Sequence, residues 1–519
     1  MRRSRDDPGD EPAARAAPVR SVRDPEVSAT TGMFGRDGAA VAHDLGAVLL
    51  VPAGMAVLTV PVAVIAGDTH AVGLLLATAA VATATGAALL HHYDHVRAVH
   101  RWPAVEVIAL GWLVTALVTA GVLLGLGLTA PADTADTTFA TPLNALVEGM
   151  SGITSTGISM VGGQEAQLTA TAQWWRSLSQ WVGGIGMVVF ALGLTTSATG
   201  MRTLYEAEGR HPDLPGGMSG TVRGTAALYA AMTGLAVAAL AVTEHTAWEA
   251  LNHGLAAVST GGFTITGDSM AGYGTTTQAV VLVVMSIGAV SFVVHHILLV
   301  QRRPAHAWRL TPLRAQVAVL VGGAVLLLAL RAATDTDRPA FDIVFQWASA
   351  AGTAGFSTVD DLAGWPVVLF VPLVAIMFVG ASSGSTGGGW KLDRLIWLLK
   401  ALRRRLTGEG PLHWDGGEVR RDAADTLVGH AGTLGALWLL TWLVGTGLLL
   451  AVTEAPVHLV LFDTASTLGN VGLSAGVVDA DLDGSAKVVL TALMYLGRLE
   501  LLTALLLATQ SEAAETTGA

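Results

Sequence analysis

Long apolar stretches recur along the chain, and polar segments separate them. Each stretch is close to the roughly 20 residues that an α-helix needs to cross a bilayer. The pattern predicts ten membrane-spanning helices, at residues 45–66, 71–90, 105–129, 174–199, 224–243, 277–300, 314–333, 366–402, 426–453 and 487–508. We therefore expect an all-α polytopic membrane protein, preceded by a polar, mostly disordered tail over residues 1–44.

Four of the segments between these stretches are too patterned to be ordinary loops. They cover residues 131–173, 244–276, 334–365 and 454–486. Each contains an amphipathic stretch that is too short to span a bilayer, followed by a turn that contains glycine. The stretches lie at residues 143–159, 248–264, 341–357 and 460–474.

The four stretches align on the turn glycines Gly157, Gly262, Gly355 and Gly472. One residue after each glycine is apolar (Ile158, Phe263, Phe356, Leu473), and two after it is a hydroxyl residue (Ser159, Thr264, Ser357, Ser474). Six before it is small (Ser151, Ala256, Ser349, Ser466), and nine before it is polar (Glu148, His253, Gln346, Asp463). Agreement at four offsets in four copies indicates an internal repeat.

Each copy reads as a span, a short half-helix, a glycine turn and a second span. A half-helix at membrane depth is tolerated only when it is buried in protein or lines a water-filled cavity. Four units around one axis would bring the four turns together at a pore, where rings of backbone carbonyls can replace the hydration shell of a cation. The alternative, four interfacial helices with glycine C-caps, stays open at this point.

The predicted fold is therefore four pseudo-symmetric repeats around one pore, plus an N-terminal two-helix hairpin. It has about ten transmembrane helices and four re-entrant half-helices. The expected boundaries are the cytoplasmic tail at 1–44, the hairpin at 45–104, and pore repeats at 105–210, 211–310, 311–410 and 411–519.

Composition agrees with a membrane protein and excludes several other classes. Charged residues make up 13% of the chain and hydrophobic residues 52%, whereas a soluble chain carries about 25% charge. The chain has no cysteine, which excludes disulfides, thiolate nucleophiles and metal sites built from cysteine. The net charge of −11 argues against a nucleic-acid partner.

Basic residues collect on one side of the predicted membrane. They include Arg97, Arg101, Arg202, Arg210, Arg223, Arg302, Arg303, Arg309, Arg314, Lys391, Arg394, Lys400, Arg403, Arg404, Arg405, Arg420 and Arg421. The four patterned outer segments contain Arg338 as their single basic residue apart from those at span boundaries. The positive-inside rule places both termini in the cytoplasm. The outer side is acidic, which predicts a mouth that concentrates cations.

Several motifs lie in the repeats and in the second span of the third repeat. They are SLSQWVGGIGM (177–187), STGGF (259–263), TAGFST (353–358), GSTGGGWK (384–391), GNVGLS (469–474) and GRLE (497–500). These motifs resemble the Trk/Ktr/HKT superfamily of K⁺ transporters, most closely the membrane subunit of bacterial Trk systems. The resemblance covers about residues 45–508. It implies K⁺ uptake across the plasma membrane by a homodimer with one pore per subunit. It further implies a cytoplasmic nucleotide-binding regulatory ring, surrounding membrane lipid, and no cofactor beyond the transported K⁺.

The resemblance also implies which backbone carbonyls form a K⁺ selectivity filter. They belong to Ser155, Thr156, Gly157, Thr260, Gly261, Gly262, Thr353, Ala354, Gly355, Asn470, Val471 and Gly472. Gly157 favours K⁺, since superfamily members with serine at the first glycine tend towards Na⁺. The chain lacks the TVGYG sequence of K⁺ channels, so a Na⁺-selective or nonselective transporter stays the alternative. The residues leave open whether transport is channel-like or a symport with H⁺ or Na⁺.

A glycine-rich run, GASSGSTGGG at residues 380–389, interrupts an otherwise apolar span, and glycine at this density breaks a helix. One interpretation is a flexible kink or a cytoplasmic loop. The resemblance implies instead an intramembrane gate with a pore-facing arginine, formed by Gly384, Ser385, Thr386, Gly387, Gly388, Gly389, Lys391 and Arg498. For Arg498 the alternatives are pairing with Glu500 or snorkelling at a helix end. For Lys391 the alternative is an ordinary position at the cytoplasmic edge.

Three patterns imitate enzyme sites without the context that such sites need. Residues 380–384 fit G-x-S-x-G, but no strand precedes them. The run at 384–391 resembles a phosphate-binding loop, but Trp390 separates its last glycine from the lysine. The histidines His91, His92 and His95 lack the glutamate spacing of a metalloprotease. We predict that the chain is not an enzyme; a membrane-embedded enzyme or scaffold is the alternative from another class.

Overall fold

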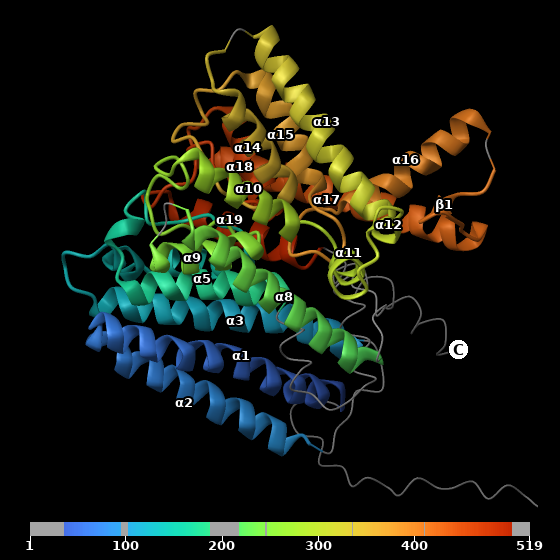
Figure 1. Cartoon of the computed structure of the whole chain (residues 1–519). Coiled ribbons are helices and arrows are strands. Elements are labelled where there is room, and N and C mark those ends of the chain that lie inside the picture. Colours follow the sequence, from blue (N-terminus) through green and yellow to red (C-terminus); the bar gives the residue numbers. More distant parts are fainter. Residues whose placement is uncertain are drawn as a thin grey trace, which may run out of the picture.

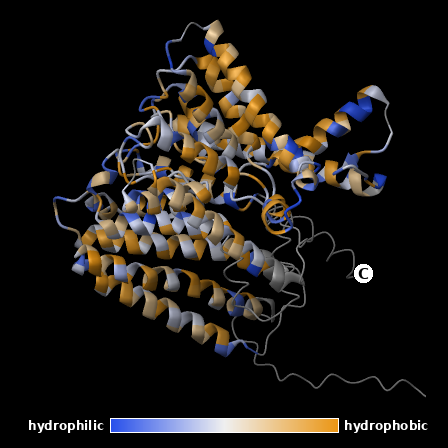
Figure 2. Cartoon of the chain, viewed as in Figure 1, coloured by the Kyte–Doolittle hydropathy of each residue, from blue (hydrophilic) through white to orange (hydrophobic). Residues whose placement is uncertain are grey.

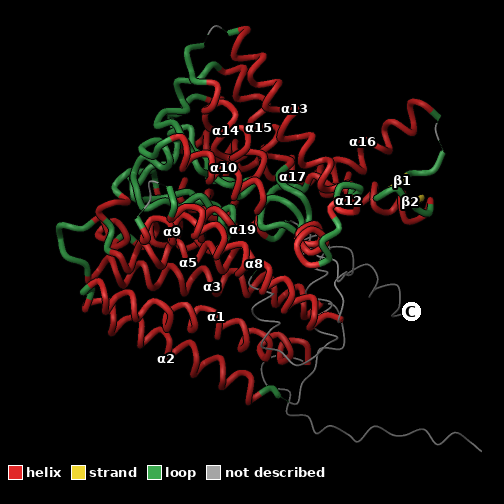
Figure 3. The backbone as a smooth tube through the Cα atoms, in the orientation of Figure 1, coloured by secondary structure: helices red, strands yellow, loops and turns green. Residues whose placement is uncertain are grey.

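The computed structural model describes residues 36–94, 102–186, 217–243, 246–334, 336–408 and 410–500. Most of the predicted tail, the second part of the predicted span 174–199 and the end of the span 487–508 lie outside these ranges. The first helix, α1 (Arg36–Ala66), begins within the segment that the sequence predicts to be a tail. Helices dominate the described part, as Figure 3 shows.

The N-terminal helices form a hairpin along one side of the molecule (Figure 1). α1 packs on α2 (Thr69–His92), and both pack on α3 (Trp102–Thr129). A Cβ added at Gly46 would lie 2.7 Å from the carbonyl oxygen of Gly86. Glycine therefore allows the two helices to cross closely, as small residues do in membrane bundles.

The rest of the described chain is built from four units with the same order of elements. Each unit has a long helix, a short helix, a glycine turn and a further helix. The units are α3, α4 (Pro142–Ile153) and α5 (Ala170–Ile185); α8 (Gly217–Ala241), α9 (Ala247–Val258) and α10 (Thr275–Gly288); α13 (Thr311–Ala333), α14 (Ala340–Gly352) and α15 (Val367–Val379); and α17 (Arg421–Val452), α18 (Val457–Leu468) and α19 (Gly484–Arg498). The short helices have 12 or 13 residues, which is too few to cross a bilayer.

The units pack on one another in a fixed order. The last helix of each unit packs on the short helix of the next: α5 on α9, α10 on α14, and α15 on α18. The order then closes, because α19 packs on α4 of the first unit. The short helices consequently lie inside the bundle and the long helices around it (Figure 1).

The second unit contains a break that the sequence did not predict. The segment consists of α10, α11 (Phe292–His295) and the π-helix η3 (His296–Val300). The predicted span over 277–300 is not one straight helix, because the chain bends there by 103°. In an unbroken helix the Phe292 amide would donate to the Gly288 carbonyl. Here the Phe292 amide donates to the carbonyl of Gly384 at 2.9 Å. The Gly288 carbonyl accepts from the Thr386 hydroxyl, also at 2.9 Å.

The third unit breaks where the glycine density predicts. α15 ends at Val379 and α16 (Leu392–Thr407) begins after residues 380–391, which we call the inner loop. Beyond it, the strands β1 (His413–Trp414) and β2 (Gly417–Glu418) form a small antiparallel hairpin. The remaining short elements are η1 (Ala135–Ala140), η2 (Glu165–Gln167) and α12 (Pro304–Ala307).

The outer helices have the composition of membrane spans. Within the described ranges, six helices are long and apolar enough to cross a membrane, or seven if the bent pair counts as one span. Their outward faces are apolar, as Figure 2 shows. Side chains such as Ile65, Leu128 and Val325 are 87%, 67% and 62% exposed. The chain is therefore a membrane protein. Fewer than ten helices pass this test because α5, α10, α15 and α19 are short in the described ranges.

Candidate functional site

The four glycine turns share one backbone conformation. Two positions before each glycine, a residue with a side chain has φ between 51° and 53°; these residues are Ser155, Thr260, Thr353 and Asn470. The turn glycines themselves have φ between 75° and 95°. A left-handed conformation costs a residue with a side chain about 1–2 kcal/mol. Its recurrence at one position in four turns indicates a backbone shape that the site requires.

Each turn is fastened to its own short helix by the same hydrogen bond. The amide before each glycine donates to the carbonyl five residues back at 2.8–2.9 Å; the pairs are Thr156 and Ser151, Gly261 and Ala256, Ala354 and Ser349, and Val471 and Ser466. In the first and fourth turns the serine hydroxyl also accepts from the glycine amide, at 3.0 Å. The small residue six positions before the glycine is thus the anchor of the turn.

The turn glycines meet in a closed ring. A Cβ added at each glycine would collide with the carbonyl oxygen of the residue before the next glycine. The contacts run from Gly157 to Gly261, from Gly262 to Ala354 at 2.5 Å, from Gly355 to Val471 at 2.5 Å, and from Gly472 back to Thr156. Real Cβ atoms do not approach other atoms so closely. Glycine is therefore needed at all four corners of this ring, which we call the glycine ring.

An acidic cavity lies on one side of the glycine ring. Its volume is about 410 Å³, and all four turn glycines line it. The acids Glu165, Asp268 and Asp360 also line it, together with Arg176. The charge of Arg176 is already matched, because its Nε lies 2.7 Å from the carboxylate of the buried Glu148. The cavity therefore carries excess negative charge, which attracts cations.

The polar residue nine positions before each glycine holds the chain that follows the turn. These residues, Glu148, His253, Gln346 and Asp463, are all 0% exposed. Their bonds reach the amides of Met160, Ile265 and Ala475 and the hydroxyls of Ser159, Ser357 and Ser474, at 2.6–3.3 Å. In the first, third and fourth units this buried side chain bonds the hydroxyl residue two positions after the glycine, so the two polar positions of the sequence repeat act together to hold the turn.

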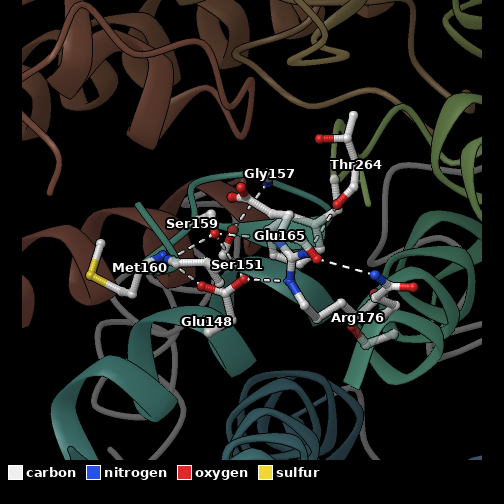
Figure 4. A network of polar contacts seen from close by, with 12 residues as sticks. Glu148, Ser151, Gly157, Ser159, Met160, Glu165, Arg176 and Thr264 are labelled. Carbon is white, nitrogen blue, oxygen red and sulfur yellow. Dashed lines mark hydrogen bonds and ion pairs between the residues drawn. The ribbon is translucent and has the colours of Figure 1, made fainter. Parts of the chain in front are cut away.

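The first unit adds an arginine to this support, as Figure 4 shows. Arg176 is 1% exposed, and its guanidinium also donates to the hydroxyl of Ser159 at 3.2 Å. It donates further to the carbonyl of Thr264 at 3.0 Å and lies 4.1 Å from the ring centroid of Phe263. Thr264 and Phe263 follow the second turn, so Arg176 joins the first unit to the second.

The inner loop lies against the other side of the turns. The hydroxyl of Thr386 donates to the carbonyl of Val258, the last residue of α9, at 3.1 Å. The amide of Gly388 donates to the hydroxyl of Thr353 in the third turn at 2.7 Å. A Cβ at Gly388 would collide with the carbonyl of Gly469 beside the fourth turn. The inner loop therefore contacts three of the four units directly below the glycine ring.

Charged side chains from the third and fourth units gather around the inner loop. Lys391 is only 5% exposed, and its Nζ donates to the carbonyl of Gly387 at 2.6 Å. The Glu500 carboxylate lies 3.3 Å from this nitrogen and 2.5 Å from the guanidinium of Arg394. Lys391 is thus buried rather than an exposed residue at the cytoplasmic edge. Arg498 donates to the carbonyl of Gly183 in the first unit at 2.5 Å and to that of Thr386 at 3.4 Å.

Several residues of this inner cluster were not singled out from the sequence. Glu500 entered only as a neighbour of Arg498, and Trp112, whose ring lies 4.9 Å from the Arg498 guanidinium carbon, did not enter at all. Arg394 was counted only as a basic loop residue. A usable signal was present, since Lys391, Arg394 and Glu500 are charges at the ends of apolar segments.

The apolar helices define an integral membrane protein, and the acidic cavity above the glycine ring is a feature expected of the ion-transport class. The chain belongs to the TrkH family of cation transport proteins, because the model of that family matches residues 113–516. This family membership also confirms the prediction that the chain is not an enzyme.

Individual relatives agree with the family. The Trk system potassium uptake protein TrkH of Halomonas elongata is 30% identical over 385 residues, covering 71% of this chain and 79% of that protein. A cation transporter of Methanocaldococcus jannaschii is 28% identical over 373 residues, covering 70% and 75%. The crystal structure of the potassium transporter TrkH from Vibrio parahaemolyticus superimposes with a TM-score of 0.77 at 24% identity, covering 91% of this chain and 99% of that one. This last likeness concerns the fold.

Proposed function

We propose that this chain is the ion-translocating subunit of a Trk-type K⁺ uptake system. The observation that carries the proposal is the closed glycine ring at the base of an acidic cavity. The names of the Halomonas and Vibrio relatives, which are potassium uptake proteins, support K⁺ as the transported ion. The protein lies in the plasma membrane with both termini in the cytoplasm, as the distribution of basic residues indicates.

In this proposal the four units are pseudo-symmetric repeats around one pore, and the short helices are re-entrant pore helices. The carbonyls of residues 155–157, 260–262, 353–355 and 470–472 form the selectivity filter. Support comes from the identical backbone of the four turns and from the closed order of packing. The C-terminal ends of four helix dipoles point to the turns and favour a cation there.

The inner loop and its charged cluster form the gate in this proposal. The loop from Gly384 to Gly389 closes the pathway below the filter, with Lys391 and Arg498 as cationic barriers. The bonds of Thr386 and Gly388 to the second and third units, and of Arg498 to the first, support a closed position. A cytoplasmic nucleotide-binding ring acting on a homodimer is the regulator that the family resemblance implies.

A growth test and a flux test examine the proposal together. The gene, with and without its regulator, is expressed in a strain that lacks K⁺ uptake and is grown at low K⁺. Purified protein is placed in liposomes, and ⁸⁶Rb⁺ and ²²Na⁺ uptake are compared, with and without a proton gradient. We expect restored growth and faster Rb⁺ than Na⁺ uptake. Absence of both growth and flux would contradict the proposal, and equal fluxes would indicate a nonselective transporter.

A further inference from the structure

A buried glutamine reaches the second turn from the neighbouring unit. Gln180 lies on α5 and is 0% exposed. Its Nε2 donates to the carbonyl of Gly261 at 2.5 Å, and its Oε1 accepts from the amide of Phe263 at 3.0 Å. The orientation of the side-chain amide is fixed, because the carbonyl needs a donor and the amide needs an acceptor. The side-chain amide of Gln180 therefore bonds the peptide groups on both sides of Gly262.

The other three units carry methionine at the same place. The reference point is a glycine near the end of each last helix: Gly183, Gly288, Gly380 and Gly497. In the first, second and fourth units, a Cβ at this glycine would meet the last carbonyl of the unit's own short helix. Three residues before these glycines lie Gln180, Met285, Met377 and Met494. All four side chains are 0% exposed. A thioether cannot donate a hydrogen bond.

Two of the methionines belong to the same apolar clusters as a residue of the next turn. Met285 shares an apolar cluster with Ala354, and Met377 shares one with Val471. Opposite Gln180 stands Gly261, where a Cβ would collide with the glutamine amide. Gly261 does not have a positive φ, so the lack of a side chain there is required by the glutamine and not by the backbone. Gln180 and Gly261 therefore form a matched pair found at one corner only.

Because the Gly261 carbonyl is held by Gln180, this carbonyl should adjust less easily to a small ion than the carbonyls of the other three turns. To coordinate Na⁺ as closely as K⁺, a carbonyl ring must contract towards its axis. In the proposed filter, moving the Gly261 carbonyl towards the axis would break its hydrogen bond to Gln180. We propose that Gln180 is a positioning residue that fixes one corner of the glycine ring and thereby sets the discrimination between K⁺ and Na⁺. This inference rests on the proposed function.

The test compares uptake of ⁸⁶Rb⁺ and ²²Na⁺ into liposomes by full-length wild-type and variant protein. For Gln180→Met, which copies the other three corners, we expect Rb⁺ uptake to persist and the Rb⁺/Na⁺ ratio to fall about fivefold, as for one lost hydrogen bond. The matched control is Gln278→Met. Gln278 is also buried and donates to the carbonyl of Met270 at 2.9 Å, outside the glycine ring. Its variant should keep the wild-type ratio.

A second variant covers a possible failure of Gln180→Met to fold. Gln180→Leu keeps a buried side chain of similar size that can neither donate to the Gly261 carbonyl nor accept from the Phe263 amide, so the ratio should again fall. A wild-type ratio in either folded variant would overturn the role of Gln180 while leaving the proposed function intact. If wild-type protein itself does not distinguish Rb⁺ from Na⁺, the proposed function fails and the role of Gln180 fails with it.

Discussion

The glycine ring and the inner loop are both built on glycine, yet they are held in opposite ways. The ring has four copies of one turn, and each is anchored largely within its own unit by a small residue and a buried polar residue. The inner loop belongs to the third unit alone. Besides the bond from Gly388 to Thr353 in its own unit, it contacts other units, through Thr386 the second and through the charged cluster around Glu500 the fourth.

Because they are held by different contacts, the inner loop could move without displacing the glycine ring. Moving the inner loop would break bonds between units but leave the anchors of every turn in place. Moving a turn would break the hydrogen bonds within its unit and the close contacts of the glycine ring. This contrast is consistent with the proposed function, in which the glycine ring stays in place as the filter and the inner loop moves as the gate.

The largest effect should follow from removing a support of the ring. Glu148→Ala leaves Arg176 buried without its carboxylate, and breaking a buried ion pair costs about 3–5 kcal/mol. We expect a marked drop in the thermal unfolding midpoint of the protein in detergent. The double variant Glu148→Ala/Arg176→Ala removes both charges and should recover part of the loss. An unchanged midpoint in the single variant would show that the turn does not depend on this support.

A smaller effect should come from a side chain placed in the ring itself. Gly157→Ser puts a Cβ against the carbonyl of Gly261 and should lower the Rb⁺/Na⁺ flux ratio about tenfold, or about 1.4 kcal/mol. The control is Gly476→Ser. Gly476 has φ of 90°, close to the 93° of Gly157, but an added Cβ meets nothing within 4 Å. If both variants change the ratio equally, backbone strain and not the ring contact sets selectivity.

Thr386→Val tests the contacts between the inner loop and the second unit. The substitution removes the hydroxyl that donates to the carbonyls of Gly288 and Val258 and accepts from the Thr260 hydroxyl at 3.3 Å. Basal Rb⁺ flux should rise about fivefold, as expected for one hydrogen bond lost from the closed state, with the Rb⁺/Na⁺ ratio unchanged. Ser385→Ala is the control, because the Ser385 hydroxyl bonds Ser382 and Gly387 within the loop. An altered ratio in Thr386→Val would contradict the division between ring and loop.

The smallest effect should come from the charges of the cavity. Asp268→Asn combined with Asp360→Asn should weaken apparent Rb⁺ affinity about twofold at low ionic strength, since exposed charges act weakly and are screened by salt. Asp481→Asn, an exposed outer residue that does not line the cavity, should have no effect. A loss of affinity that persists at high salt would mean that these carboxylates bind the ion directly.

The sequence predicted the ring better than it predicted the loop, and the reason is physical. Each turn repeats residues at fixed offsets from its glycine, and all four copies are visible along the chain. These offsets were enough to predict which residues anchor the turns. The role of Gln180 could not be predicted in this way, because its partners, Gly261 and Phe263, lie in another unit.

The inner loop depends on contacts that no local pattern contains. The break after Gly288 arises because Gly384 and Thr386, nearly a hundred residues later, take over its hydrogen bonds. Hydropathy alone reads residues 277–300 as one span. The burial of Lys391 likewise depends on Glu500 from the fourth unit. The sequence could therefore place the break in the glycine run itself but not the break that the run causes elsewhere.

The glycine ring is made by one polypeptide, and this has a consequence for how such a pore can evolve. In an assembly of four identical subunits, every substitution arrives at all corners at once. Here a single codon change alters one corner of the ring in four, so under the proposed function ion preference could change in small steps. Glutamine at one corner and methionine at the other three is a difference that four identical subunits could not carry.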